Sequence, residues 1–143
     1  MVKKYFKNKS NITAQIAEMK KLYPSFRYAI RGNDIIFKGE IQVKPEFSVY
    51  TISLKYSTNK HPIVKILNPK LVENPPHFYS KTKSLCLYHP KNFYWDNNKL
   101  IANEIMDWTI AWIYFYEVWL ETNIWYGPEV PHNNNKENRF YDK

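Results

Sequence analysis

The chain contains one residue that could act as a strong nucleophile near neutral pH, and that residue is Cys86. It lies in the segment HFYSKTKSLCLYHPKNFYW, residues 77–95, between two leucines and among histidines and aromatic residues. A thiolate attacks carbonyl carbons readily, and the thioester that forms stays reactive towards amines. Without further context, a lone cysteine between leucines is more often a small apolar residue that fills a core. The residue types leave both interpretations open.

The segment around Cys86 is rich in groups that can carry positive charge. A free cysteine has a pKa of about 8.5, so only a few per cent is thiolate at pH 7 unless neighbours lower that pKa. Cations that the fold brings close to the sulfur would favour the thiolate. The basic residues of the segment are His77, Lys81, Lys83, His89 and Lys91.

Other kinds of site have little support in the sequence. A single cysteine excludes an intramolecular disulfide and a zinc site made of cysteines alone. No two of the four histidines are spaced as a metal-binding pair on one helix, so we expect no metal and no cofactor. The net charge of +8 is compatible with RNA, and residues 88–95, YHPKNFYW, could stack single-stranded bases. Because the lysines are spread along the chain, RNA binding is kept only as an alternative.

The elements that must hold this segment can be predicted from periodicity. Apolar residues at helical spacing predict a first helix that begins near Ile12 and stops at Pro24. Ser10 or Asn11 would cap it. The apolar face of this helix comprises Ile12, Ile16, Met19 and Tyr23.

Four strands are expected next, at residues 26–30, 34–43, 48–57 and 63–67. Gly39 in the second strand indicates a bulge. In the third strand every second residue is apolar, which is the period of a half-buried antiparallel strand. These alternating residues are Tyr50, Ile52, Leu54 and Tyr56.

Residues 68–98 follow no period, contain four prolines and are rich in aromatic residues. A long irregular stretch of this kind favours a functional role. Helical spacing resumes after a cap at Asp96 or Asn97 and continues to about Thr122, in one helix or two. A stripe in this region is expected to belong to the core, and it consists of Trp108, Trp112, Phe115 and Trp119.

This order of elements indicates an α+β domain with helices packed on one face of an antiparallel sheet. We expect a single domain over residues 1–132 and a polar, mobile tail over residues 133–143. The basic N-terminus is not followed by an apolar signal region, and no apolar run is long enough to cross a bilayer. We therefore expect a cytoplasmic protein.

The layout resembles the ubiquitin-conjugating (UBC) fold, in which a helix, a four-stranded meander and an extended segment with the catalytic cysteine precede C-terminal helices. Residues 50–67, YTISLKYSTNKHPIVKIL, are similar to the third strand, turn and fourth strand of that family. His77 lies nine residues before Cys86, near the position of the His in the family's His-Pro-Asn motif. Trp95 lies nine residues after Cys86, near the family's tryptophan.

The C-terminal half is similar to the bacterial branch of the UBC family. The stretches LCLY (85–88), YEVWL (116–120) and WYGPEVPH (125–132) resemble motifs of that branch. The resemblance covers about residues 10–132. It implies a stand-alone conjugating-like protein from a CBASS anti-phage operon, which acts on the C-terminus of a nucleotidyltransferase that makes cyclic oligonucleotides. A different ubiquitin-like conjugation operon is the alternative context.

By this resemblance, Cys86 accepts the C-terminus of a protein as a thioester and passes it to an amine. His77 shapes the site, with a general base as the lesser possibility. We expect the Cys86 sulfur to face solvent in a shallow groove. Because the chain has no adenylation domain, we also expect a separate activating enzyme or an already activated carrier. An inactive UBC-fold module that binds a protein partner is the alternative from another class.

One departure from the eukaryotic pattern concerns the oxyanion. This chain has His77-Phe78-Tyr79 where the motif has His-Pro-Asn, so the Asn that supports the oxyanion in the family is missing. Members of the bacterial branch generally lack it too, which implies that another group takes the role. One preorganised donor is worth roughly 3 kcal/mol. The candidates, among which the sequence does not choose, are Tyr79, Tyr88, Asn92, the His77 imidazole and backbone N–H groups beside Cys86.

Overall fold

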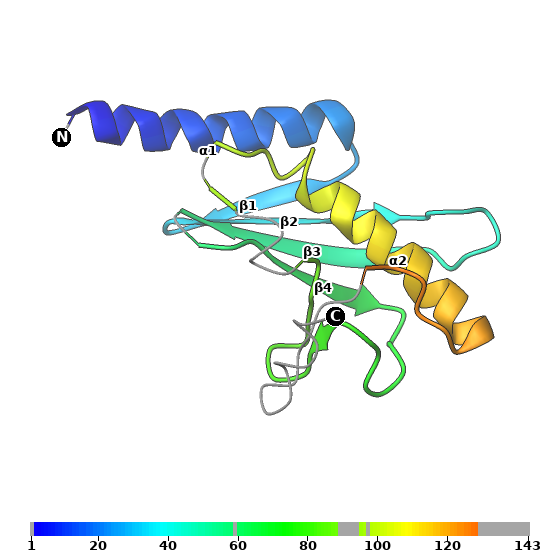
Figure 1. Cartoon of the computed structure of the whole chain (residues 1–143). Coiled ribbons are helices and arrows are strands. Elements are labelled where there is room, and N and C mark those ends of the chain that lie inside the picture. The colour runs from blue at the N-terminus through cyan, green and yellow to red at the C-terminus, as the bar shows by residue number, and fades with distance from the viewer. Residues whose placement is uncertain (1, 59, 89–94, 97, 129–143) are drawn as a thin grey trace.

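The computed structural model describes residues 2–58, 60–88, 95–96 and 98–128, with side chains from residue 11 onward. The predicted tail, residues 133–143, lies outside the described residues. The described residues form two helices, a four-stranded sheet and a small hairpin that comes between the sheet and the second helix in chain order. Figure 1 shows how these elements are arranged. The elements are α1 (Val2–Leu22), β1 (Arg27–Arg31), β2 (Asp34–Ile41), β3 (Tyr50–Ser57), β4 (Ile63–Asn68), β5 (Phe78–Tyr79), β6 (Ser84–Leu85) and α2 (Ile105–Thr122).

Strands β1 to β4 form an antiparallel meander in the order β1-β2-β3-β4. β2 and β3 pair without interruption from Asp34 opposite Ser57 to Ile41 opposite Tyr50. The four strands predicted from the sequence are confirmed, with small shifts at their ends. The alternation of β3 is confirmed as well, because its buried residues are Tyr50, Ile52, Leu54 and Tyr56.

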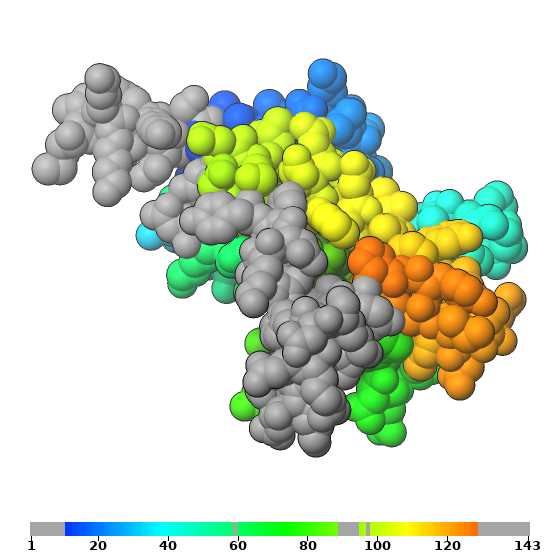
Figure 2. All heavy atoms as spheres, viewed as in Figure 1, coloured from blue at the N-terminus to red at the C-terminus, as the bar shows by residue number. Residues whose placement is uncertain are grey.

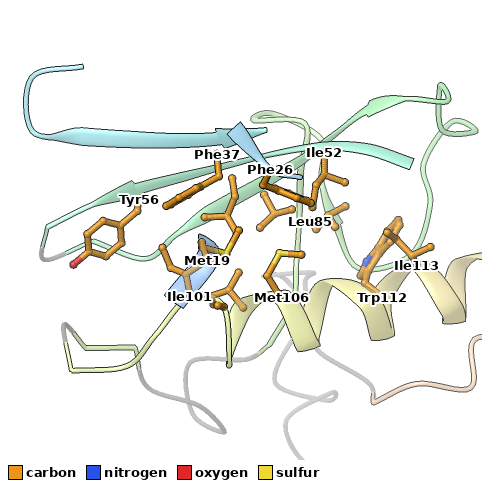
Figure 3. Packing of buried hydrophobic residues seen from close by; sticks show 14 of the residues in the cluster. Met19, Phe26, Phe37, Ile52, Tyr56, Leu85, Ile101, Met106, Trp112 and Ile113 are labelled. Atoms are coloured by element: carbon orange, nitrogen blue, oxygen red, sulfur yellow. The ribbon is translucent and has the colours of Figure 1, made fainter. Parts of the chain in front are cut away.

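Both helices cover one face of the sheet, which confirms the α+β class. Figure 3 shows side chains of the sheet, such as Phe37 and Ile52, facing Met106 of α2 and Met19 of α1. These four side chains are at most 1% exposed. Within the described residues, neither helix is long and apolar enough to cross a membrane. Burial of these apolar surfaces is the main force that holds the layers together.

The first helix begins at Val2, so the predicted start near Ile12 is wrong. Nothing in the sequence between them would interrupt a helix, since it contains neither proline nor glycine. The side-chain oxygen of Asn11 does not cap a helix end but accepts a hydrogen bond from the Tyr56 hydroxyl. The predicted apolar face is confirmed, because Met19 is buried and the other members pack against the core; these are Ile12, Ile16 and Tyr23.

The second helix is a single one that begins at Ile105, so the start predicted after Asp96 or Asn97 is wrong. Asp96 instead accepts a hydrogen bond from the backbone N–H of Asn98 at 2.8 Å, which closes a turn. Asn97 lies outside the described residues.

Gln15 of α1 holds the segment that leads into α2. Its side-chain amide donates to the Lys99 carbonyl oxygen at 2.8 Å, and its oxygen accepts from the Ile101 N–H at 2.8 Å. Gln15 is fully buried, and both of these bonds satisfy groups that would otherwise be costly to bury. The irregular segment is therefore fixed at its C-terminal end by the first helix.

Gly39 is not at a bulge, contrary to the prediction. It pairs in register with Ile52, and the irregularity of the sheet lies between β3 and β4, at Thr51 and Ile52. A Cβ atom on Gly39 would come within 2.3 Å of the Phe26 ring. The glycine is therefore required by close packing.

Candidate active site around Cys86

Cys86 follows a short hairpin that periodicity could not reveal. Strands β5 and β6 pair antiparallel, with Phe78 opposite Leu85 and Tyr79 opposite Ser84. The pairing continues by one step, because the Cys86 N–H donates to the His77 carbonyl oxygen at 3.0 Å. The nine-residue spacing of these two residues in the sequence therefore makes them cross-strand neighbours. Two-residue strands are too short to show a period of two.

The backbone of the hairpin is bent in unusual ways. In the hairpin and the residues just before it, three non-glycine residues have positive φ: Asn74 at 52°, His77 at 54° and Lys83 at 57°. Such residues cost about 1–3 kcal/mol each and persist only where the surroundings hold them. A tertiary contact holds His77 in this conformation, since its carbonyl oxygen also accepts a hydrogen bond from Trp112 Nε1 at 2.9 Å. The position of Cys86 is thus fixed through His77 by the second helix.

The His77 imidazole is buried and neutral. Its side chain is 8% exposed, and its ring lies 4.8 Å from the Trp125 ring at a tilt of 36°. Burial lowers the pKa of His77 to about 4. At pH 7 this residue therefore supplies no positive charge to Cys86 and is a weak base.

Cys86 does not face solvent, so that expectation is wrong. The residue is 3% exposed, and burial raises the pKa of its thiol. A hydrogen bond from the Tyr79 side chain opposes that shift, as does one from the Tyr88 backbone, but both are weaker than the burial effect. Sγ also lies 3.9 Å from the Tyr88 carbonyl oxygen, where it can act only as a donor. The described conformation holds a protonated thiol.

The lysines of the segment do not act as predicted. Lys81 and Lys83 are exposed, in and next to the turn between β5 and β6. None of the groups that shift the Cys86 pKa is a cation. His89 and Lys91 lie outside the described residues. The predicted electrostatic activation of the thiol therefore has no support in this conformation.

Cys86 lines a partly open, mostly apolar hollow of about 60 Å³ beside α2, here called the Cys86 hollow. A water molecule needs about 10–15 Å³ by this measure, so the space suits a few waters or a slender chain end. The stripe predicted as core is only partly core, because Trp108 and Phe115 are half-buried walls of this hollow. The lining residues are His77, Cys86, Leu87, Tyr88, Trp108, Ala111, Trp112, Phe115, Trp125 and Pro128.

The segment after α2, residues 123–128 and here called the exit segment, forms one side of the Cys86 hollow. Asn123 ends the helix with φ at 63°, and its N–H donates to the Trp119 carbonyl oxygen at 2.7 Å. The chain then turns back along α2 (Figures 1 and 2), and its orange residues lie against the yellow helix. A Cβ atom on Gly127 would come within 2.6 Å of the Phe115 ring, so only glycine allows this close return.

A second hollow, of about 180 Å³, lies next to the segment around Cys86 and shares Leu87 and Tyr88 with the first hollow. The His61 Nδ1 atom lies 2.8 Å from the Tyr88 hydroxyl, and burial raises the pKa of Tyr88 to about 12. This pairing of His61 with Tyr88 across 27 positions left no signal in the sequence. The residues that line this hollow are His61, Pro62, Tyr79, Leu85, Leu87 and Tyr88.

The oxyanion donors that the sequence suggested are mostly engaged. The Cys86 N–H bonds to the His77 carbonyl, and the Tyr79 side chain bonds to the thiol. The Tyr88 hydroxyl lies against His61. Asn92 lies outside the described residues.

Trp95 is part of the core and does not reach the Cys86 hollow. It is 5% exposed and packs edge-on against Tyr56, with 6.3 Å between ring centroids. Because Trp95 is buried and Tyr88 is half-buried, the predicted base-stacking surface is missing from the described part of residues 88–95. Residues 89–94 lie outside the described chain. No cluster of three or more His, Cys, Asp or Glu side chains among the described residues could hold a metal ion.

The model of the family described as "Type II CBASS E2 protein" matches residues 15–133, which is most of the chain. The matched span contains the sheet, the hairpin, Cys86, His77 and the exit segment. No curated protein matches the chain.

Proposed function

The chain belongs to the family of type II CBASS E2 proteins, and on this premise we propose that it carries an acyl group as a thioester on Cys86 and transfers it to an amine. The family itself gives a conjugation-related role in CBASS anti-phage defence. The observation that carries the proposal is the position of the only cysteine. Cys86 lies at the end of a hairpin held by α2, in the wall of a partly open apolar hollow within the matched span.

The proposed reaction has two steps that both use the sulfur. In the first, Sγ attacks the activated carbonyl carbon of a protein C-terminus, the thiol proton leaves to solvent, and the activating group departs with its electron pair. In the second, an amine attacks the thioester carbon, the C–S bond breaks, and the amine loses a proton. Sulfur suits this role because a thioester is a good acyl donor to amines.

In this proposal His77 positions the reacting groups and does not act as a base. Its carbonyl oxygen holds the Cys86 N–H at 3.0 Å, and its neutral ring packs on Trp125. A histidine with a pKa of about 4 is a poor proton acceptor near neutral pH. The Tyr79 hydrogen bond is the contact that favours the thiolate once the sulfur is exposed.

The size of the Cys86 hollow supports a narrow acyl donor. A space of about 60 Å³ admits a chain end without bulky side chains, such as one that ends in glycine. The proposed partners are a CD-NTase, the cyclic-oligonucleotide synthase, or a ubiquitin-like protein from the same operon. A separate activating enzyme or a preactivated carrier would supply the activated carboxyl group.

One observation favours a second candidate, an inactive module that only binds a partner. Cys86 is 3% exposed and its pKa is raised, as in a structural cysteine. The two candidates differ in whether a covalent adduct forms on the sulfur.

In the test, wild type and Cys86 variants are each incubated with the operon partners, and adducts are detected on non-reducing gels and by intact mass. Wild type should form an adduct that a thiol removes, Cys86→Ser a thiol-resistant ester, and Cys86→Ala none. Ser84→Ala, on the same strand and 6% exposed, is the control for disturbance of the hairpin and should still form the thioester. If Cys86→Ala is modified as much as wild type, Cys86 is not the nucleophile. Partner binding with no adduct in any variant would establish the binding module instead.

A further inference from the structure

Two buried indole N–H groups lack a hydrogen-bond partner in the part of the chain that the structure describes, those of Trp95 and Trp125. Leaving a buried donor unpaired costs about 1–3 kcal/mol, and such groups are rare in folded proteins. Trp95 is enclosed in the core against Tyr56. Trp125, in contrast, lines the Cys86 hollow. Of these two donors, only that of Trp125 belongs to a ring that borders a space where a ligand fits.

The Trp125 ring is held firmly in place. It packs on the His77 ring at 4.8 Å, on Trp112 at 5.9 Å and on Phe115 at 5.8 Å. Gly127 lets the exit segment approach Phe115 closely enough for these contacts. The neighbouring Trp112 Nε1 is already used, because it donates to the His77 carbonyl oxygen. Of the Trp112 and Trp125 indole N–H groups in this wall, the first is therefore satisfied and the second has no partner among the described residues.

We propose that the Trp125 Nε1–H donates a hydrogen bond to the carbonyl oxygen of the acyl group on Cys86 and supplies the oxyanion donor of the transfer reaction. This inference rests on the proposed function. When a nucleophile adds to the carbonyl carbon, the electron pair of the C=O bond moves to that oxygen. A fixed donor in a water-poor site stabilises the charge that develops there. When the tetrahedral intermediate collapses, the electron pair on the oxygen re-forms the C=O bond and the leaving group departs. The indole keeps its proton throughout.

An indole suits this position because it only donates and does not titrate near neutral pH. The two tyrosine hydroxyls near the thiol already have partners in the described conformation. The Tyr79 side chain bonds to the Cys86 thiol, and the Tyr88 hydroxyl lies 2.8 Å from His61. In this proposal Trp125, from the exit segment after α2, takes the role that the missing Asn has in the eukaryotic family.

The test is the rate of thioester formation in a single turnover with Trp125→Phe, which removes the N–H and keeps an aromatic ring. We expect a rate about 100- to 1,000-fold lower than wild type. Alkylation of Cys86 by iodoacetamide, which needs no carbonyl donor, should stay within about twofold. Trp95→Phe, which removes the other unpaired indole donor, should form the thioester at the wild-type rate. A wild-type rate for Trp125→Phe overturns the inference. If Cys86→Ala still abolishes the adduct, the proposed function stands.

A second measurement needs no change at Trp125. In ¹⁵N-labelled protein the indole resonances are assigned by triple-resonance experiments, then compared between free Cys86→Ser and its stable acyl ester. A new hydrogen bond to the ester carbonyl should move the Trp125 indole proton downfield by more than any other indole proton. An unmoved Trp125 resonance in the loaded protein would contradict the inference. If no ester or thioester forms at all, the proposed function itself fails.

Discussion

The sheet with its two helices and the region around Cys86 differ in how their buried polar groups are hydrogen-bonded. Under the sheet the described buried side-chain groups are paired except for the Trp95 indole N–H: Gln15 makes two hydrogen bonds to the segment before α2, and the Tyr50 hydroxyl donates to Glu117 at 2.5 Å. Around Cys86 the backbone adopts positive φ, a histidine and a thiol have shifted pKa values, and the Trp125 donor has no partner among the described residues. Apart from the Trp95 donor, these departures from local rules gather at the proposed site, which is where function is expected to produce them.

The largest effect on stability is expected from a change in the scaffold. Leu54 is fully buried in β3, and Leu54→Ala should lower the free energy of unfolding by about 2–5 kcal/mol because it leaves a cavity. Urea denaturation measures this loss. The alkylation rate of Cys86 under conditions where the variant stays folded should not change. A large change in that rate would show that the two regions are not independent.

The next largest effect is a pH dependence of stability that comes from His77. The folded-state pKa of about 4 lies below the usual value of 6.5, so only the unfolded chain takes up the proton between these values. Stability should therefore fall as the pH is lowered from 6.5 to 4, by at most about 3 kcal/mol, and by less where solvent screens the ring. Urea denaturation at several pH values measures the slope.

His77→Asn is the matched variant for this prediction. Asparagine tolerates the positive φ of 54° and carries no group that titrates in the same range. The variant should lose the part of the pH dependence between 6.5 and 4 that wild type shows. If both proteins have the same slope, the buried imidazole is not its source.

Two glycines give a direct contrast between the regions. A Cβ atom would meet Phe26 at Gly39 and Phe115 at Gly127, so each change to alanine should cost about 1–3 kcal/mol of stability. Because Phe115 lines the Cys86 hollow, only Gly127→Ala should also alter the alkylation rate of Cys86. Equal alkylation rates in both variants would argue against a role of the exit segment in the hollow.

The smallest effect is expected at Tyr79. Its side chain donates to Cys86 and lowers the pKa of the thiol, so Tyr79→Phe should raise that pKa further. Alkylation at pH 8 should then be about two- to fourfold slower than in wild type. Tyr28→Phe, a change of the same chemistry on β1, should have no effect. A faster reaction in Tyr79→Phe would mean that Tyr79 shields the sulfur more than it stabilises the thiolate.

The scaffold could be predicted because its signals are local. The alternation in β3 and the apolar face of α1 follow from the geometry of single elements. The start of α1 could not be predicted, since the side chain of Asn11 is used by Tyr56, which is 45 positions away. Helix boundaries depend on such tertiary partners more than helix existence does.

The candidate site was predictable only as a pair of residues. The spacing of His77 and Cys86 anticipated that they lie together, which the hairpin explains. The burial of the sulfur could not be anticipated, because the walls of its hollow come from α2 and the exit segment. The Trp125 donor without a partner among the described residues could not be anticipated either, because its burial depends on tertiary contacts.

The most direct test of the account is the intact mass of wild-type protein after incubation with its operon partners, followed by peptide mapping. An added acyl mass is expected on the peptide that contains Cys86. Neutral hydroxylamine, which cleaves thioesters, should remove it, and a phosphine reductant, which cleaves disulfides, should not. An adduct lost only with the phosphine, or one that maps to a peptide without Cys86, would contradict the claim that this cysteine carries a thioester.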